Sequence, residues 1–135
     1  MLIRILTTIA SIITIGFGVW HFFVPKAWQW YTYIDSKATE LILAVQAINI
    51  FFSLSLVVLG LANIVLLWSG KSNRFSILVL LSVSVVLWVT RSILQIAYPQ
   101  GSINPILQYG MLSVFLVVTA CYILAFVLTL VQKSA

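Results

Sequence analysis

Residues 39–68 read TELILAVQAINIFFSLSLVVLGLANIVLLW, a stretch in which Glu40 is the only charged residue. A helix needs roughly 20 apolar residues to cross the hydrocarbon core of a bilayer, so this stretch is long enough to tilt or to project beyond the membrane. Comparable apolar runs occupy about 2–24, 75–98 and 106–131. The sequence therefore predicts an all-α integral membrane protein, built as an up-and-down bundle of four transmembrane helices.

The overall composition also indicates that lipid is the solvent. Of the 135 residues, 63% are hydrophobic and 7% are charged. Soluble domains are typically about 45–50% apolar and about 25% charged. Because four spans take up roughly 80 residues, only short loops remain, and we expect residues 1–135 to form a single four-span membrane domain.

Prolines, glycines and aromatic residues mark the connections between the spans. Pro25 ends the first span, because proline has no N–H to offer the preceding turn. Residues 26–34, KAWQWYTYI, are rich in rings that prefer the headgroup boundary, so we expect a short interfacial aromatic helix there. Polar turns that contain glycine or proline follow at 69–74 and 99–105.

The basic residues at the span ends predict the orientation in the membrane. The side with both termini holds Arg4, Lys71, Arg74 and Lys133, whereas the other side holds Lys26, Lys37 and the two acidic residues, Asp35 and Glu40. We therefore expect cytoplasmic termini and a plasma-membrane location, with a bacterial inner membrane favoured by the brevity of the chain. The formal net charge of +5 is spread over the span ends and forms no patch, so we expect no nucleic-acid partner.

Small and polar residues recur at helical spacing within the spans. The first span has Thr7, Ser11, Thr14, Gly18 and His21, and the second has Gln46, Asn49, Ser53 and Gly60. Such spacing places each set on one face of its helix. In a bilayer that face turns toward other helices, where small residues allow close approach and polar residues form hydrogen bonds. Helix packing is therefore the default interpretation of these stripes.

Larger polar side chains collect in the outward half of the predicted bundle. Arg91 lies about seven residues inside the third span, hence roughly 10 Å deep, and a charge at such a depth usually faces the bundle interior. We expect an outward-facing pocket centred on it and formed with Gln46, Gln95, His21, Trp88, Tyr98 and Gln108. Arg91 supplies the charge, and Gln46 and Gln95 supply hydrogen bonds. Trp88 and Tyr98 form an aromatic wall.

Two plainer interpretations of Arg91 compete with a ligand site. Its stem can carry the guanidinium up to the headgroups without any ligand. Alternatively, the guanidinium makes a structural bond to Glu40, to Gln46 or to backbone carbonyls. For His21, which follows Trp20 near a span end, the plainer interpretation is a hydrogen-bonded interfacial residue.

The sequence lacks the residue sets of several common chemistries. One histidine and one cysteine cannot build a usual structural zinc site or supply the paired histidines of a b-type haem. There is no Gly-rich phosphate loop, nucleophile elbow or HExxH motif. Asp35 and Glu40 are the only acidic residues, so paired catalytic carboxylates are missing as well. We therefore expect a non-enzymatic protein without a metal or cofactor.

The segment 18–25, GVWHFFVP, together with Glu40 at the start of the second span and Leu59-Gly60-Leu61 within it, resembles the DoxX-like four-helix membrane proteins. The resemblance covers the first two spans. It implies a four-helix bundle and a role as a membrane subunit linked to quinone or thiol redox chemistry.

Three functional hypotheses remain open. The first is a bundle that self-associates or binds a partner membrane protein, because most of its surface can contact only lipid or other spans. The second is a binding or transport site for a small amphipathic or anionic molecule, such as a lipid, a quinone or a carboxylate, centred on Arg91. The third, an accessory subunit of a membrane oxidoreductase, is implied by the family resemblance alone.

Overall fold

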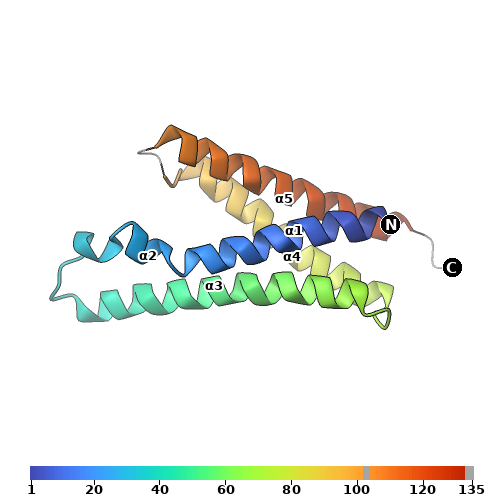
Figure 1. The fold of residues 1–135 in the computed structure, drawn as a ribbon, viewed down its shortest axis with the longest axis horizontal. Helices are drawn as coiled ribbons and strands as arrows, with labels where there is room; N and C mark the ends of the chain where they lie inside the picture. Colours follow the sequence, from blue (N-terminus) through green and yellow to red (C-terminus); the bar gives the residue numbers. More distant parts are fainter. Residues whose placement is uncertain (102–103, 133–135) are drawn as a thin grey trace.

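The computed structural model describes residues 1–101 and 104–132, and within them it contains four long helices and no strands (Figure 1). The long helices are α1 (Leu2–His21), α3 (Thr39–Trp68), α4 (Arg74–Ala97) and α5 (Pro105–Val131). Two short pieces, α2 (Val24–Ala27) and the 3-10 helix η1 (Trp30–Tyr33), lie between α1 and α3. All four long helices are apolar and long enough to cross a membrane, which confirms the predicted four-helix bundle.

The first helix ends earlier than the predicted boundary at residue 24, because of Pro25. α1 ends at His21, four positions before this proline. Proline cannot donate the i→i−4 hydrogen bond, and its ring clashes with the carbonyl that would accept it. Pro25 instead lies in the first turn of α2, where a missing N–H costs nothing. The carbonyl of His21 is therefore left for a donor from elsewhere.

The aromatic segment after α1 is helical as predicted, but it forms two pieces rather than one helix over 26–34. α2 and η1 are separated by a bend at Gln29, whose backbone is left-handed (φ +51°). The Thr32 hydroxyl donates to the Gln29 carbonyl (2.8 Å) at this bend. Trp30 then packs against the His21 ring, with 6.2 Å between ring centroids. We call the end of the bundle that holds α2 and η1 the aromatic end (Figure 1).

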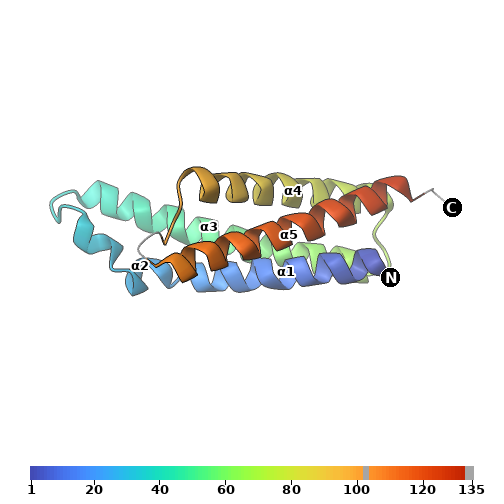
Figure 2. The same ribbon diagram turned by 90° about the horizontal axis from the view of Figure 1, so that it is seen from above.

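The four long helices do not close evenly around the bundle. α1 packs against both α3 and α5, and α4 packs along α5 (Figures 1 and 2). α3 and α4 are joined by the short turn at 69–73, yet they make few contacts and diverge toward the aromatic end. The bundle is therefore open along the seam between α3 and α4.

Two glycines allow α1 and α3 to approach closely. A Cβ atom on Gly18 of α1 would lie 2.8 Å from the Ser53 carbonyl oxygen, and one on Gly60 of α3 would lie 2.9 Å from the Ser11 carbonyl oxygen. Both distances are shorter than a carbon can tolerate beside a backbone oxygen. The two helices thus meet backbone to backbone, as the stripes of small residues predicted.

Polar side chains buried in the middle of the bundle satisfy one another. The Tyr122 hydroxyl of α5 lies 3.2 Å from the Ser11 hydroxyl and 3.3 Å from that of Thr14, both on α1. Between α3 and α4, Asn63 Nδ2 donates to Ser84 Oγ (2.9 Å). These bonds fix the rotation of each helix about its axis, because unpaired polar groups are costly where water is absent.

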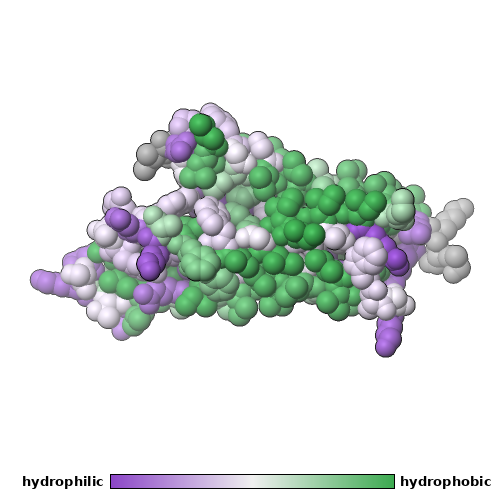
Figure 3. Space-filling model, in the orientation of Figure 1, coloured by the Kyte–Doolittle hydropathy of each residue, from purple (hydrophilic) through white to green (hydrophobic). Residues whose placement is uncertain are grey.

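The surface agrees with a protein that spans a bilayer several times. A hydrophobic band covers the middle of the face shown in Figure 3, and hydrophilic residues gather at its two ends. At the end where α1 begins, the Arg74 guanidinium donates to the carbonyls of Thr129 (3.0 Å) and Leu130 (2.6 Å). A cation is favoured there, because the α5 helix dipole is negative at its C-terminus.

Candidate functional site

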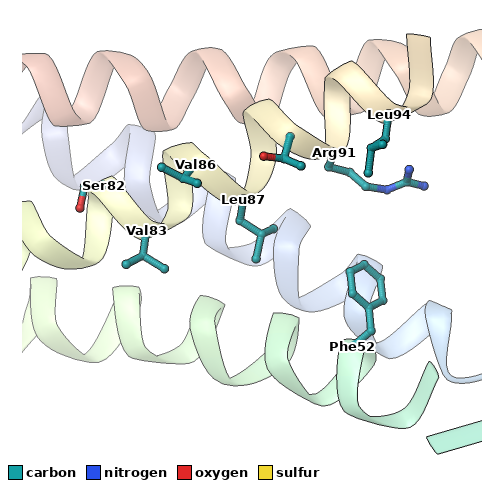
Figure 4. Close-up of a pocket in the computed structure, with 8 residues that line it drawn as sticks. Phe52, Ser82, Val83, Val86, Leu87, Arg91 and Leu94 are labelled. Atoms are coloured by element: carbon teal, nitrogen blue, oxygen red, sulfur yellow. The ribbon is translucent and has the colours of Figure 1, made fainter. Parts of the chain in front are cut away.

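The seam between α3 and α4 contains an apolar groove of about 520 Å³ (Figure 4). It is lined by Phe52 of α3 and, from α4, by Ser82, Val83, Val86, Leu87, Thr90, Arg91 and Leu94. We call this space the α3–α4 groove. Val86 is 67% exposed and Val83 48% exposed, so the groove faces sideways, toward the hydrocarbon of a surrounding bilayer.

A second, smaller pocket of about 300 Å³ adjoins the groove at the aromatic end. Its lining residues are His21, Trp30, Val45, Ile48, Asn49, Phe52, Arg91, Leu94 and Gln100. We call it the end pocket. Phe52, Arg91 and Leu94 line both spaces. Arg91 therefore lies where the apolar groove meets the end pocket, which His21, Asn49 and Gln100 also line.

The Arg91 guanidinium extends from α4 toward the aromatic end, past Leu94 (Figure 4). Its Nη2 donates to Gln100 Oε1 (2.6 Å). Its Cζ lies 4.6 Å from the centroid of the Phe115 ring and 5.9 Å from that of Phe17. These cation–π contacts place the charge beside two aromatic rings of α1 and α5.

The hydrogen-bond partner of Arg91 differs from the structural partners considered from the sequence. It is the side-chain amide of Gln100, and neither Glu40 nor Gln46 bonds to the guanidinium. Within residues 1–101 and 104–132, no carboxylate lies within ion-pair distance of Arg91. A neutral acceptor and two aromatic faces leave the positive charge without an anionic counterpart in this part of the chain.

Gln95 holds Gln100 in place. Gln95 is 2% exposed, and its Nε2 donates to the Gln100 carbonyl (3.0 Å), while its Oε1 accepts from the Gln100 N–H (3.4 Å). Gly101 follows with φ +75°, a conformation that glycine adopts without strain, and so turns the chain at this point. The Gln100 side chain is thereby aimed back at Arg91.

His21 and Asn49 form a reciprocal pair on the other wall of the end pocket. Asn49 Nδ2 donates to the His21 carbonyl (3.2 Å), which is the carbonyl that Pro25 leaves without its helical donor. The Asn49 Oδ1 atom lies 2.8 Å from His21 Nδ1. The His21 ring also packs edge-on against Phe52, with 4.8 Å between centroids. The ring is therefore fixed in both position and rotation.

The structure brings three of the sequence-predicted site residues together. Arg91 and His21 line the end pocket, and Gln95 acts on it through Gln100. Trp88 is fully buried and faces the core between α1 and α5 instead of the groove. Its indole Nε1 has no hydrogen-bond partner among the described residues.

The other predicted residues lie apart from the pocket. Gln46 is exposed and does not line the end pocket, although the preceding residue, Val45, does. Tyr98 is 75% exposed and follows the last residue of α4, where the backbone has already left helical geometry. Gln108 is partly buried near the start of α5 and lines neither the groove nor the end pocket.

Seven residues that line the end pocket were missing from the prediction: Trp30, Val45, Ile48, Asn49, Phe52, Leu94 and Gln100. A signal existed for Asn49, since it belongs to the polar stripe of its span and since Pro25 frees the carbonyl that it binds. The position of Gln100 depends on the path of a loop, and no spacing rule predicts that path.

These features define the class of protein: a multi-pass α-helical membrane protein with a lateral groove that ends in a charged pocket. No protein-family model, curated protein or solved structure matches the chain. The function must therefore be inferred from the site itself, and the DoxX-like resemblance stays a prediction.

Proposed function

We propose that the protein binds an anionic amphipathic molecule taken from the membrane. The apolar tail lies along the α3–α4 groove, and a phosphate or carboxylate head meets Arg91 at the mouth of the end pocket. One observation carries this proposal: Arg91 lines both the apolar groove and the end pocket, and its partners among the described residues are a neutral amide and two aromatic rings.

The chemistry of arginine favours an anion over a neutral quinone. A guanidinium offers several N–H donors in a planar fork that matches phosphate and carboxylate oxygens. Among the described residues, one of those donors is engaged, by Gln100. A charge held inside a membrane protein is costly, and such residues commonly mark ligand pathways. Binding an anion relieves that cost.

We expect loss of the charge to abolish selective binding of anionic lipid. Arg91→Gln removes a charge-assisted hydrogen bond, a contribution of about 1.5–3 kcal/mol, and so weakens binding about tenfold to a hundredfold. The measurement is native mass spectrometry of the protein with phosphatidylglycerol and with phosphatidylcholine.

Arg4→Gln is the matched control, because it removes an equal charge at the other end of the bundle. Arg4 also lies over an aromatic ring, with its Cζ 5.2 Å from the centroid of Trp68. Thermal unfolding of both variants shows whether the fold is intact. Equal lipid binding by wild type and a folded Arg91→Gln variant rules out the proposed site.

The proposed location is a plasma membrane with cytoplasmic termini, which makes the end pocket outward-facing. Arg4, Lys71 and Arg74 at one end against Lys26 and Lys37 at the other support this orientation.

Cysteine labelling tests the orientation. In a Cys121→Ser background, Lys37→Cys is expected to react with a membrane-impermeant maleimide added to intact cells, and Ser72→Cys is expected to react only after lysis. The reverse pattern contradicts the orientation.

A second candidate function is self-association or assembly with a partner membrane protein. It is supported by the open seam and by the exposed apolar residues of α3, among them Ile48 (68% exposed) and Phe51 (74% exposed). A transmembrane helix from a second chain could pack over the same seam. The native mass spectra discriminate between the two, because a monomer with bound lipid and no copurified protein excludes assembly.

A further inference from the structure

We infer that the bound head carries a hydroxyl group beside its anionic group, and that His21 Nε2 accepts a hydrogen bond from it. This inference rests on the proposed function and specifies the class of ligand: a hydroxylated anionic head, as in a phosphoglycerol, rather than a simple phosphate ester.

The Asn49 amide determines which nitrogen of the His21 ring carries the proton. Asn49 uses its Nδ2 to donate to the His21 carbonyl (3.2 Å), so the amide is oriented with Oδ1 toward the ring. Oδ1 has no proton and can only accept, and it lies 2.8 Å from Nδ1. Nδ1 must therefore carry the hydrogen. In a neutral imidazole the other nitrogen, Nε2, is then an acceptor with a free lone pair.

The charge of the His21 ring depends on its neighbours in the end pocket. Arg91 lines the same pocket and already supplies one positive charge, and no carboxylate is present among the lining residues. Two cations in one partly buried pocket repel each other. Burial of the ring and repulsion from Arg91 both favour the neutral form of His21, in which Nε2 stays an acceptor.

The Nε2 atom of His21 makes no hydrogen bond within the described part of the chain. The buried side-chain polar atoms that lack a partner there are Thr7 Oγ1 and Trp88 Nε1, so Nε2 is not a buried atom. It is therefore at least partly accessible, and His21 lines the end pocket together with Trp30.

Together these groups form a two-part recognition surface. Arg91 donates and selects an anion, whereas His21 Nε2 accepts and selects a donor. The anion cannot satisfy Nε2, because a phosphate diester and a carboxylate offer no hydrogen in their charged forms. A head with a hydroxyl close to the charge satisfies both.

The test compares two lipids that differ only in the hydroxyls of the head. Phosphatidylglycerol and phosphatidylpropanol with the same acyl chains are both monoanionic phosphodiesters with a three-carbon head, and only the first can donate to Nε2. In native mass spectrometry the wild type is expected to prefer phosphatidylglycerol about fivefold, the value of one neutral hydrogen bond. His21→Phe keeps the ring packing and is expected to bind both lipids equally, still dependent on Arg91.

Nitrogen NMR provides a second measurement that needs no variant. His21 is the only histidine in the chain, so ¹⁵N-histidine labelling gives signals from this ring alone. In phosphatidylcholine nanodiscs we expect a protonated Nδ1 and an unprotonated Nε2, and a shift of the Nε2 signal when phosphatidylglycerol is added. A proton on Nε2 in the unliganded protein overturns the inference. Equal, Arg91-dependent binding of the two lipids also overturns it and leaves the proposed function intact, whereas failure to bind either lipid overturns both.

Discussion

Gly60→Ala is expected to destabilise the bundle by about 1–3 kcal/mol, although glycine to alanine normally stabilises a helix interior. The added Cβ would lie 2.6 Å from Ile15 Cγ1 and 2.9 Å from the Ser11 carbonyl oxygen. The isoleucine side chain can rotate away, but the carbonyl belongs to the backbone of α1. The two helices must therefore separate, and the contacts that they share weaken along their length.

Gly16→Ala provides the control within the same pair of helices. A Cβ at this position has no atom within 4 Å, so the change is expected to stabilise α1 by about 0.5–1 kcal/mol. The free energies of unfolding are measured by titration with sodium dodecyl sulfate from one mild detergent. If both variants shift stability in the same direction, α1 and α3 do not approach as closely as this structure has them.

Gln100→Glu is expected to weaken binding of an anionic ligand about tenfold to a hundredfold, as much as loss of Arg91 itself. The Gln100 Oε1 atom already lies 2.6 Å from the Arg91 guanidinium. A carboxylate there becomes an internal anion that forms a charge-assisted pair and occupies the donors a ligand needs. The fold is expected to remain intact, because Gln95 bonds only to the backbone of residue 100.

Gln100→Ala is expected to act in the opposite direction. It frees the guanidinium, so anionic lipid binds as well as to the wild type or more tightly. Gln29→Glu, an equal charge change on the exposed bend between α2 and η1, is the control for a general electrostatic effect. Unchanged affinity in Gln100→Glu, measured by the same native mass spectrometry, means that the anion does not bind at Arg91.

The fold could be predicted from the sequence because span length and hydropathy leave few alternatives in a bilayer. The stripe of Thr7, Ser11, Thr14 and Gly18 is buried, as its spacing predicted. The end of α1 was misplaced by three residues, since the effect of Pro25 extends back to the carbonyl four positions before it. The bend at Gln29 depends on a left-handed backbone that this residue type does not signal.

The site was only partly predictable, for a geometric reason. Spacing along one helix fixes which residues share a face, but it does not fix the axial offset or the rotation between helices. Gln46 and Asn49 lie on the same stripe, yet only Asn49 is level with the end of α1 and bonds to His21. Arg91 and Trp88 also belong to one stripe, yet the tryptophan is buried in the core and the arginine lines the edge of the groove.

The sideways opening of the α3–α4 groove decides how the site would be filled. A molecule that enters there comes from the bilayer and returns to it without passing through water. Occupancy then follows the mole fraction of the ligand among the membrane lipids, not its dissolved concentration. Diluting the sample would not empty the groove, whereas adding neutral lipid would, because the lipids that surround the protein compete with the ligand for it.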